Sequence, residues 1–196
     1  MRLFREPLLQ LSEYENIRKN LQEKACPVGV EGCVDAQKTH WMASFSGDYP
    51  IKLIITHSEK RVKEIYEDYR FFDKNVYSYP ARDIIFYSAD VHGQLLVGQR
   101  LSVIQRLLEG EPVTVVTTID GLMDSLLPPE RLAEQIIRIQ EGGVADQESL
   151  VKRLVHMGFE RAVQVEGPGQ FSVRGGILDV YNLADDCPYR IEFWDD

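Results

Sequence analysis

GQFSVRGGILDVYNLADDCPYRIEFWDD, residues 169–196, is the stretch that decides the fold of the C-terminal part of this 196-residue chain. The runs 171–174, 177–181 and 189–193 are rich in β-branched, aromatic and aliphatic residues, as strands are. Gly175-Gly176 and the link 182–188 supply the breaks between these runs. The stretch therefore predicts three short strands in a small, mostly antiparallel sheet.

Two of these strands carry an arginine among apolar residues, Arg174 in the first and Arg190 in the last. Ser172 shares a strand face with Arg174, and Glu192 shares one with Arg190, so we expect Arg190 and Glu192 to pair in place. The planar guanidinium suits carboxylates of a partner protein. Such a site is one interpretation; the other is an ordinary solvated arginine on a half-exposed strand.

The part of the chain before residue 128 alternates strand and helix signals, which predicts an open, largely parallel α/β sheet. Residues 51–56, IKLIIT, form a continuous apolar run of the kind buried in parallel sheets. Ser58 is expected to cap the next helix, and the Ser12-x-x-Glu15 pattern a first helix. The further elements expected here are strands at 75–79 and 112–117 and helices at 12–24, 95–108 and 120–126.

Pro128-Pro129 interrupts this alternation, and we place a domain boundary there, with domains at 1–127 and 128–196. In the second domain we expect a strand at 135–140, a helix from Asp146 to about Met157, and a strand at 162–165 before the three strands above. This pattern is typical of a small α+β domain.

Residues 32–39, GCVDAQKT, nearly fit the nucleotide-binding loop G-x-x-x-x-G-K-[S/T]. Gly32, Lys38 and Thr39 match, but Gln37 stands where the second glycine lets the backbone wrap phosphate groups. Asp35 adds negative charge to a cradle that should attract anions. The strand 112–117 also lacks an acidic end to hold magnesium. We therefore expect no active ATP hydrolysis, and either a vestigial nucleotide loop or a plain helix start.

The bulk composition bounds the remaining possibilities. The formal net charge is −9, whereas domains that bind nucleic acid through phosphates are usually basic. Three cysteines without a paired spacing indicate reduced thiols, and the four histidines show no metal-ligand spacing with them. We find no signal peptide or apolar run of transmembrane length. These features favour a cytoplasmic protein without a metal and with no membrane contact.

The motif at 169–181, followed by Tyr189-Arg-Ile-Glu-Phe193, resembles the UvrB-homology module at the N-terminus of bacterial transcription-repair coupling factors (Mfd). The excision-repair helicase UvrB carries a related form. The resemblance runs from about residue 51 to the C-terminus. It implies a degenerate P-loop-like sheet similar to helicase domain 1A, followed by a small α+β domain similar to UvrB domain 2. It also implies that the chain is truncated and that its parent continues with further domains.

The resemblance implies a binding surface for UvrA, the damage-recognition ATPase, in the second domain. By motif position this surface comprises Arg161, Arg174, Arg190, Glu192 and Phe193. One departure is Ser172, which stands where UvrB has a further arginine.

The implied role is a non-catalytic module that recruits UvrA to RNA polymerase stalled at DNA lesions. ATP and Mg²⁺ would belong to the motor domains of the parent, a DNA translocase that contacts RNA polymerase and duplex DNA through other domains. The parent's C-terminal domain would mask the UvrA face. Two alternatives remain: a UvrB-like helicase core with a working nucleotide site, and a DNA-contacting module. The short segment 75–95 argues against the second, because UvrB inserts a long aromatic hairpin at the damage.

Overall fold

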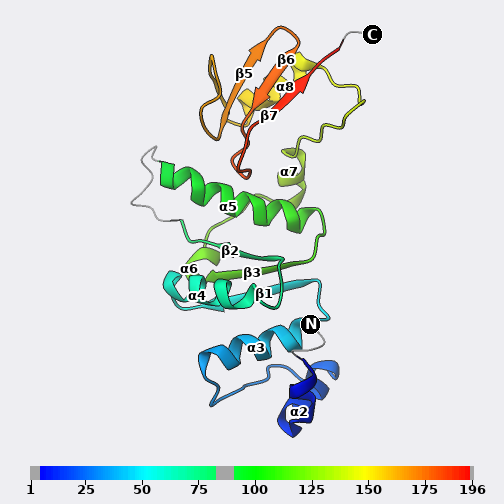
Figure 1. The fold of residues 1–196 in the computed structure, drawn as a ribbon, viewed down its shortest axis with the longest axis vertical. Coiled ribbons are helices and arrows are strands. Elements are labelled where there is room, and N and C mark those ends of the chain that lie inside the picture. Colours follow the sequence, from blue (N-terminus) through cyan, green and yellow to red (C-terminus); the bar gives the residue numbers. More distant parts are fainter. Residues whose placement is uncertain (1–4, 83–90, 195–196) are drawn as a thin grey trace. The chain divides into compact units, whose positions relative to one another are not determined.

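The computed structural model describes residues 5–82 and 91–194, with side chains of the helix that begins at Val91 described from residue 95 (Figure 1). The chain forms two compact units. The first comprises Met1–Ala81 with Gly110–Met123, and the second comprises Arg82–Glu109 with Asp124–Asp196. The chain thus passes between the units more than once, and the boundary expected at residues 127/128 stays a prediction.

The first unit is built on a three-stranded sheet of order β1-β3-β2 in which both pairings are parallel. The expected parallel α/β sheet is therefore confirmed. Ser58 caps the helix that follows β1, because its hydroxyl accepts a hydrogen bond from the Arg61 backbone N–H at 3.3 Å. The elements are η1 (Glu6–Gln10), α2 (Ser12–Gln22), α3 (Asp35–Ser46), β1 (Ile51–Thr56), α4 (Glu59–Tyr69), β2 (Val76–Tyr79), β3 (Val113–Thr118) and α6 (Ile119–Leu122).

The core of the first unit lies between the sheet and the helices α3 and α4. Its buried members are Ala43, Val62, Ile65, Tyr69, Val76 and Val116. All of β3 is buried, whereas Ile51, Leu53 and Ile55 of β1 are half-exposed. The expectation that the whole run 51–56 is buried was wrong, because β1 is an edge strand and only its alternate residue Ile54 packs on the helices.

The second unit contains a four-stranded sheet of order β4-β5-β6-β7, shown with α8 against it in Figure 1. β4 runs parallel to β5, and the other two pairings are antiparallel, as the sequence predicted. The elements are α5 (Val91–Leu108), α7 (Pro129–Glu134), α8 (Gln147–His156), β4 (Glu160–Arg161), β5 (Gln170–Arg174), β6 (Ile177–Val180) and β7 (Tyr189–Glu192).

Three local expectations were wrong. Residues 135–140 are not a strand; they follow α7, and the Arg153 guanidinium donates to the carbonyls of Glu134 and Ile136 at 3.0 and 3.4 Å in place of a strand neighbour. The strand expected at 162–165 lies earlier, at β4. The capping box at Ser12 does not form, because Leu11 is the cap residue and the Ser12 hydroxyl donates to Glu13.

The core of the second unit lies between α8 and one face of the small sheet. Leu150 and Leu154 of α8 are buried against Phe171 of β5 and Leu178 of β6. Asp146 caps α8 by accepting a hydrogen bond from the Ser149 N–H at 2.9 Å. Since α8 covers one face, polar residues of the strands collect on the other.

Candidate functional site

The face of the small sheet opposite α8 carries the two arginines of the sequence motif. Phe171, Val173 and Leu178 point toward α8, so the alternate residues point away from it. Asp179 of β6 lies opposite Ser172 of β5 on one side and opposite Arg190 of β7 on the other. Residues that share this outer face, by register, are Ser172, Arg174, Ile177, Asp179, Arg190 and Glu192.

Arg174, Asp179 and Arg190 form one ion cluster, which we call the arginine cluster. Arg190 donates from Nε and Nη2 to the two carboxylate oxygens of Asp179, at 2.7 and 3.0 Å. Arg174 donates from Nη2 to Asp179 Oδ2 at 2.9 Å. The arginine side chains are 57% and 55% exposed, whereas that of Asp179 is 13% exposed. The carboxylate is thus shielded while both guanidiniums remain open to a partner.

The expected ion pair between Arg190 and Glu192 was wrong, because Arg190 pairs with Asp179 on the neighbouring strand instead. Residues two apart on one strand are separated by about 6.6 Å along it, whereas directly opposed residues are about 4.5–5.5 Å apart. Asp179 was not among the residues expected at this site. Its place between two apolar residues in the strand 177–181 was the available signal.

The two arginines hold the pKa of the Asp179 carboxyl down, from 3.8 to about 2. The hydrogen bonds from Arg190 are the main cause; burial opposes them, and the hydrogen bond from Arg174 adds to them. The carboxylate therefore stays ionised throughout the neutral and mildly acidic range. Two guanidinium charges and one carboxylate leave the cluster with a formal net charge of +1.

This low pKa predicts an acid-dependent loss of stability. Above about pH 5 the ion pairs contribute fully; as pH falls toward about 2, the unfolded chain takes up the proton first and the contribution disappears. Asp179→Asn lacks that contribution at every pH. The difference in melting temperature between the wild type and this variant is therefore expected to shrink as pH falls from about 5 to 2. A difference that stays constant over this range would contradict the prediction.

A depression of about 460 Å³ lies beside the arginine cluster, lined by residues of the 164–165 loop and of β5, β6 and β7. Ser172 is buried, and its hydroxyl donates to the Val163 carbonyl at 2.9 Å. Ser172, the one departure from the UvrB pattern noted in the sequence, therefore holds the loop at Val163 in place. The exposed positive charge of the arginine cluster comes from Arg174 and Arg190.

Two residues of the expected UvrA-binding set lie elsewhere. Arg161 is exposed and pairs with Phe171, so the register places it on the α8 side of the edge strand β4. Phe193 packs against the core under α8. The structure thus brings Arg174 and Arg190 together, places Glu192 on the same face, and separates Arg161 and Phe193 from them.

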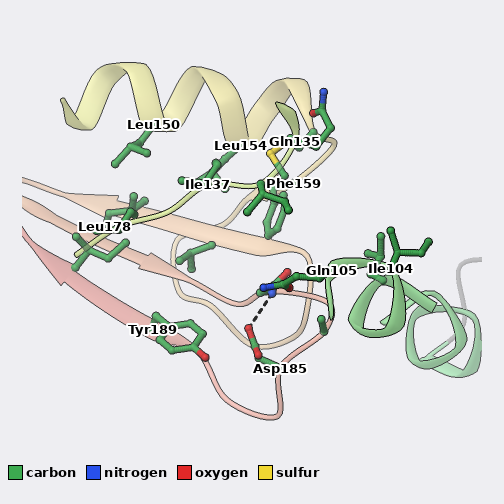
Figure 2. A pocket seen from close by; sticks show the side chains of 18 of the residues that line it. Ile104, Gln105, Gln135, Ile137, Leu150, Leu154, Phe159, Leu178, Asp185 and Tyr189 are labelled. Carbon is green, nitrogen blue, oxygen red and sulfur yellow. Dashed lines mark hydrogen bonds between the residues drawn. The ribbon is translucent and has the colours of Figure 1, made fainter. Parts of the chain in front are cut away.

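A second, apolar cavity of about 540 Å³ lies on the α8 side of the second unit (Figure 2). Figure 2 shows Leu150 and Leu154 pointing from α8 toward Leu178 and the sheet. At its rim the Asn182 amide donates to Asp185 at 2.8 Å. Tyr189 and Arg190 border this cavity as well as the depression at the arginine cluster. Its lining joins apolar residues of the core to apolar residues of α5 and α7, with polar side chains such as Asn182 and Asp185 at the rim.

The nucleotide-loop motif begins a helix in the structure. Gly32 has a φ of 78°, which suits glycine, and α3 already begins at Asp35. The Lys38 N–H donates to the Val34 carbonyl at 2.9 Å, and the buried Thr39 hydroxyl donates to the Asp35 carbonyl at 3.3 Å. These groups are therefore used inside the helix, which is the geometry of a plain helix start.

The charges near this helix start are satisfied by one carboxylate. Asp35 accepts from Lys38 Nζ at 3.1 Å and pairs with Arg61 of α4 at 2.9 Å. The hydrogen bond from Lys38 and the charge of Arg61 lower the pKa of Asp35. A cavity of about 650 Å³ adjoins these residues between α3, β1 and α4. The expected vestigial loop lies at this helix start, with Gln37 in the first turn of α3. The positive charges of Lys38 and Arg61 are neutralised there by Asp35 of the same chain.

Among the side chains described, those of residues 5–82 and 95–194, no group of three or more histidine, cysteine, aspartate or glutamate residues could hold a metal ion. Over the same described ranges, none of the helices combines the length and apolar character needed to cross a bilayer.

Comparison with known proteins gives a family-model match and several curated relatives. A family model for the UvrB interaction domain matches residues 137–196. The transcription-repair-coupling factor of Bacillus subtilis is 36% identical over 144 residues, which are 72% of this chain and 12% of that protein. That of Staphylococcus epidermidis is 29% identical over 150 residues, 76% of this chain and 13% of that protein. The chain thus spans about an eighth of these curated relatives. Over the part they match, the chain is thus homologous to the transcription-repair-coupling factors, and residues 137–196 match the UvrB interaction domain.

Proposed function

We propose that this chain is the part of a transcription-repair-coupling factor that binds UvrA and recruits it to RNA polymerase stalled at DNA lesions. The observation that carries the proposal is the arginine cluster, which lies on the face of the UvrB interaction domain that α8 leaves open. Arginines are enriched at protein interfaces and suit carboxylates of a partner. The cluster remains positive although the chain carries a net charge of −9.

The proposed binding needs no nucleotide on this chain. Lys38 and Thr39, the residues expected to meet phosphate and magnesium, make their contacts within α3, and Asp35 places a negative charge beside them. ATP and Mg²⁺ would act in the motor domains of the longer protein. We also assign the contacts with RNA polymerase and duplex DNA to other domains, and propose that the C-terminal domain masks the arginine face in the intact cytoplasmic protein.

Titration of this chain with purified UvrA at moderate salt, without nucleotide on the chain, tests the proposal. We expect a complex that weakens as salt rises, because exposed charge pairs are screened. Lys38→Ala should bind as the wild type does. No complex with a folded wild-type chain would contradict the proposal.

A helicase core with a working nucleotide site makes a different prediction for the same variant. It requires ATP to raise the melting temperature of the wild type and Lys38→Ala to abolish that rise. The helix start at Asp35 leads us to expect no such rise.

A further inference from the structure

We infer that Asp179 is a positioning residue of the docking face, which holds the guanidiniums of Arg174 and Arg190 in the orientation that an acidic partner meets. The inference rests on the proposed function, since it concerns the same face. It assigns a role to a carboxylate that does not itself attract the partner. Its consequence is that removing a negative charge from this face weakens the binding of an acidic partner.

The geometry gives Asp179 this role because it lies on the central strand of the three that carry the cluster. Arg190 is directly opposite it, and Arg174 is diagonal to it across β5 and β6. Both carboxylate oxygens are used, one shared between the two arginines. The Asp179 side chain is shielded beneath two side chains that are each more than half exposed.

The cluster leaves donors available to a partner. A guanidinium has five N–H donors, and Arg190 donates to Asp179 through Nε and Nη2 while Arg174 donates through Nη2 alone. Among the described residues these are the hydrogen bonds that the two guanidiniums make. The remaining donors can bind partner carboxylates through forked hydrogen bonds, which are stronger and more directional than single ones.

Preorganisation is the physical reason why an anchored arginine binds better than a free one. Ordering a long side chain at an interface costs conformational entropy when that side chain is mobile in the free protein, and this cost weakens the complex. Asp179 holds both arginine side chains in place before the partner arrives. Net charge alone predicts the opposite effect, because Asp179→Asn raises the formal charge of the cluster from +1 to +2.

The test is titration of UvrA with Asp179→Asn and with Asp186→Asn as the matched control. Asp186 is an exposed carboxylate of the 182–188 link whose substitution changes the net charge by the same amount. We expect at least a tenfold weaker complex for Asp179→Asn and an unchanged one for Asp186→Asn. Equal or tighter binding by Asp179→Asn would overturn the inference.

A second measurement on the free chain separates this inference from the proposed function. In the wild type, the Arg190 Nε–H is expected to exchange slowly with water in NMR spectra because it donates to Asp179 at 2.7 Å. It should exchange at least tenfold faster in Asp179→Asn and remain slow in Asp186→Asn. If the wild type fails to bind UvrA, the proposed function fails while this difference still supports a positioning role. Fast exchange in the wild type would overturn the inference whatever UvrA does.

Discussion

Arg190→Ala is expected to weaken the complex with UvrA at least 30-fold. Truncating one partner of a desolvated charge pair at an interface costs about 2–5 kcal/mol, and each 1.4 kcal/mol is a factor of about ten in affinity. Two losses combine at this position. The partner loses the forked donor of Arg190, and Asp179 loses the hydrogen bonds at 2.7 and 3.0 Å that neutralise it.

The measurement is isothermal titration of UvrA into each folded variant, with Arg131→Ala as the matched control. Arg131 is an exposed arginine on α7 in the same unit, so the control removes the same charge away from the arginine cluster. Arg190→Lys tests the forked geometry, since lysine keeps the positive charge but lacks the planar guanidinium; we expect an intermediate affinity. An Arg190→Ala variant that binds as tightly as Arg131→Ala would exclude this face as the docking site.

The same titration with UvrA is extended to alanine variants of Arg174 and Arg161. Arg174→Ala is expected to have a smaller effect than Arg190→Ala, because Arg174 makes one hydrogen bond to Asp179 where Arg190 makes two. Arg161 remains a prediction of the family resemblance, and the register places it on the opposite side of the sheet. Its alanine variant shows whether the edge strand β4 adds to the surface.

Local signals in the sequence were enough to predict most elements of this fold. β-Branched runs between glycine and proline breaks placed β1, β2 and β3, and the same signals with Gly175-Gly176 placed the hairpin of β5 and β6. The cap residue Ser58 behaved as its side-chain chemistry predicts. These features depend on residues close in sequence, which is why they could be foreseen.

The features that could not be foreseen depend on pairing between distant residues. The expected strand at 135–140 has a strand-like composition, yet Arg153 of α8 meets its neighbouring carbonyls instead. The partner of Arg190 could not be chosen between Glu192 and Asp179 until the register of β6 and β7 was known. The separation of Phe193 from Arg190 likewise follows from alternation within β7 and the residue after it, combined with the side on which α8 packs.

The largest expected loss of stability comes from Asp73→Ala in the first unit. The Asp73 carboxylate accepts from Lys52 Nζ of β1 and from the Thr114 hydroxyl of β3, both at 2.8 Å. It also accepts from the Asn75 N–H at 2.9 Å, just before β2. One side chain thus joins all three strands of the sheet. Because Lys52 is only 11% exposed, removing Asp73 leaves a shielded ammonium without its partner, which typically costs about 3–5 kcal/mol.

Urea denaturation followed by tryptophan fluorescence measures this loss, since Trp41 is buried in the first unit beside Tyr14. The matched control is Lys52→Met with Asp73→Ala in one chain. This double variant removes both charges, so we expect it to recover about 2 kcal/mol or more of the free energy of unfolding lost in the single variant. Equal stability of the single and double variants would show that the stranded ammonium is not the cause. At a urea concentration at which the Asp73→Ala variant stays folded, this variant should still bind UvrA, because the arginine cluster belongs to the other unit.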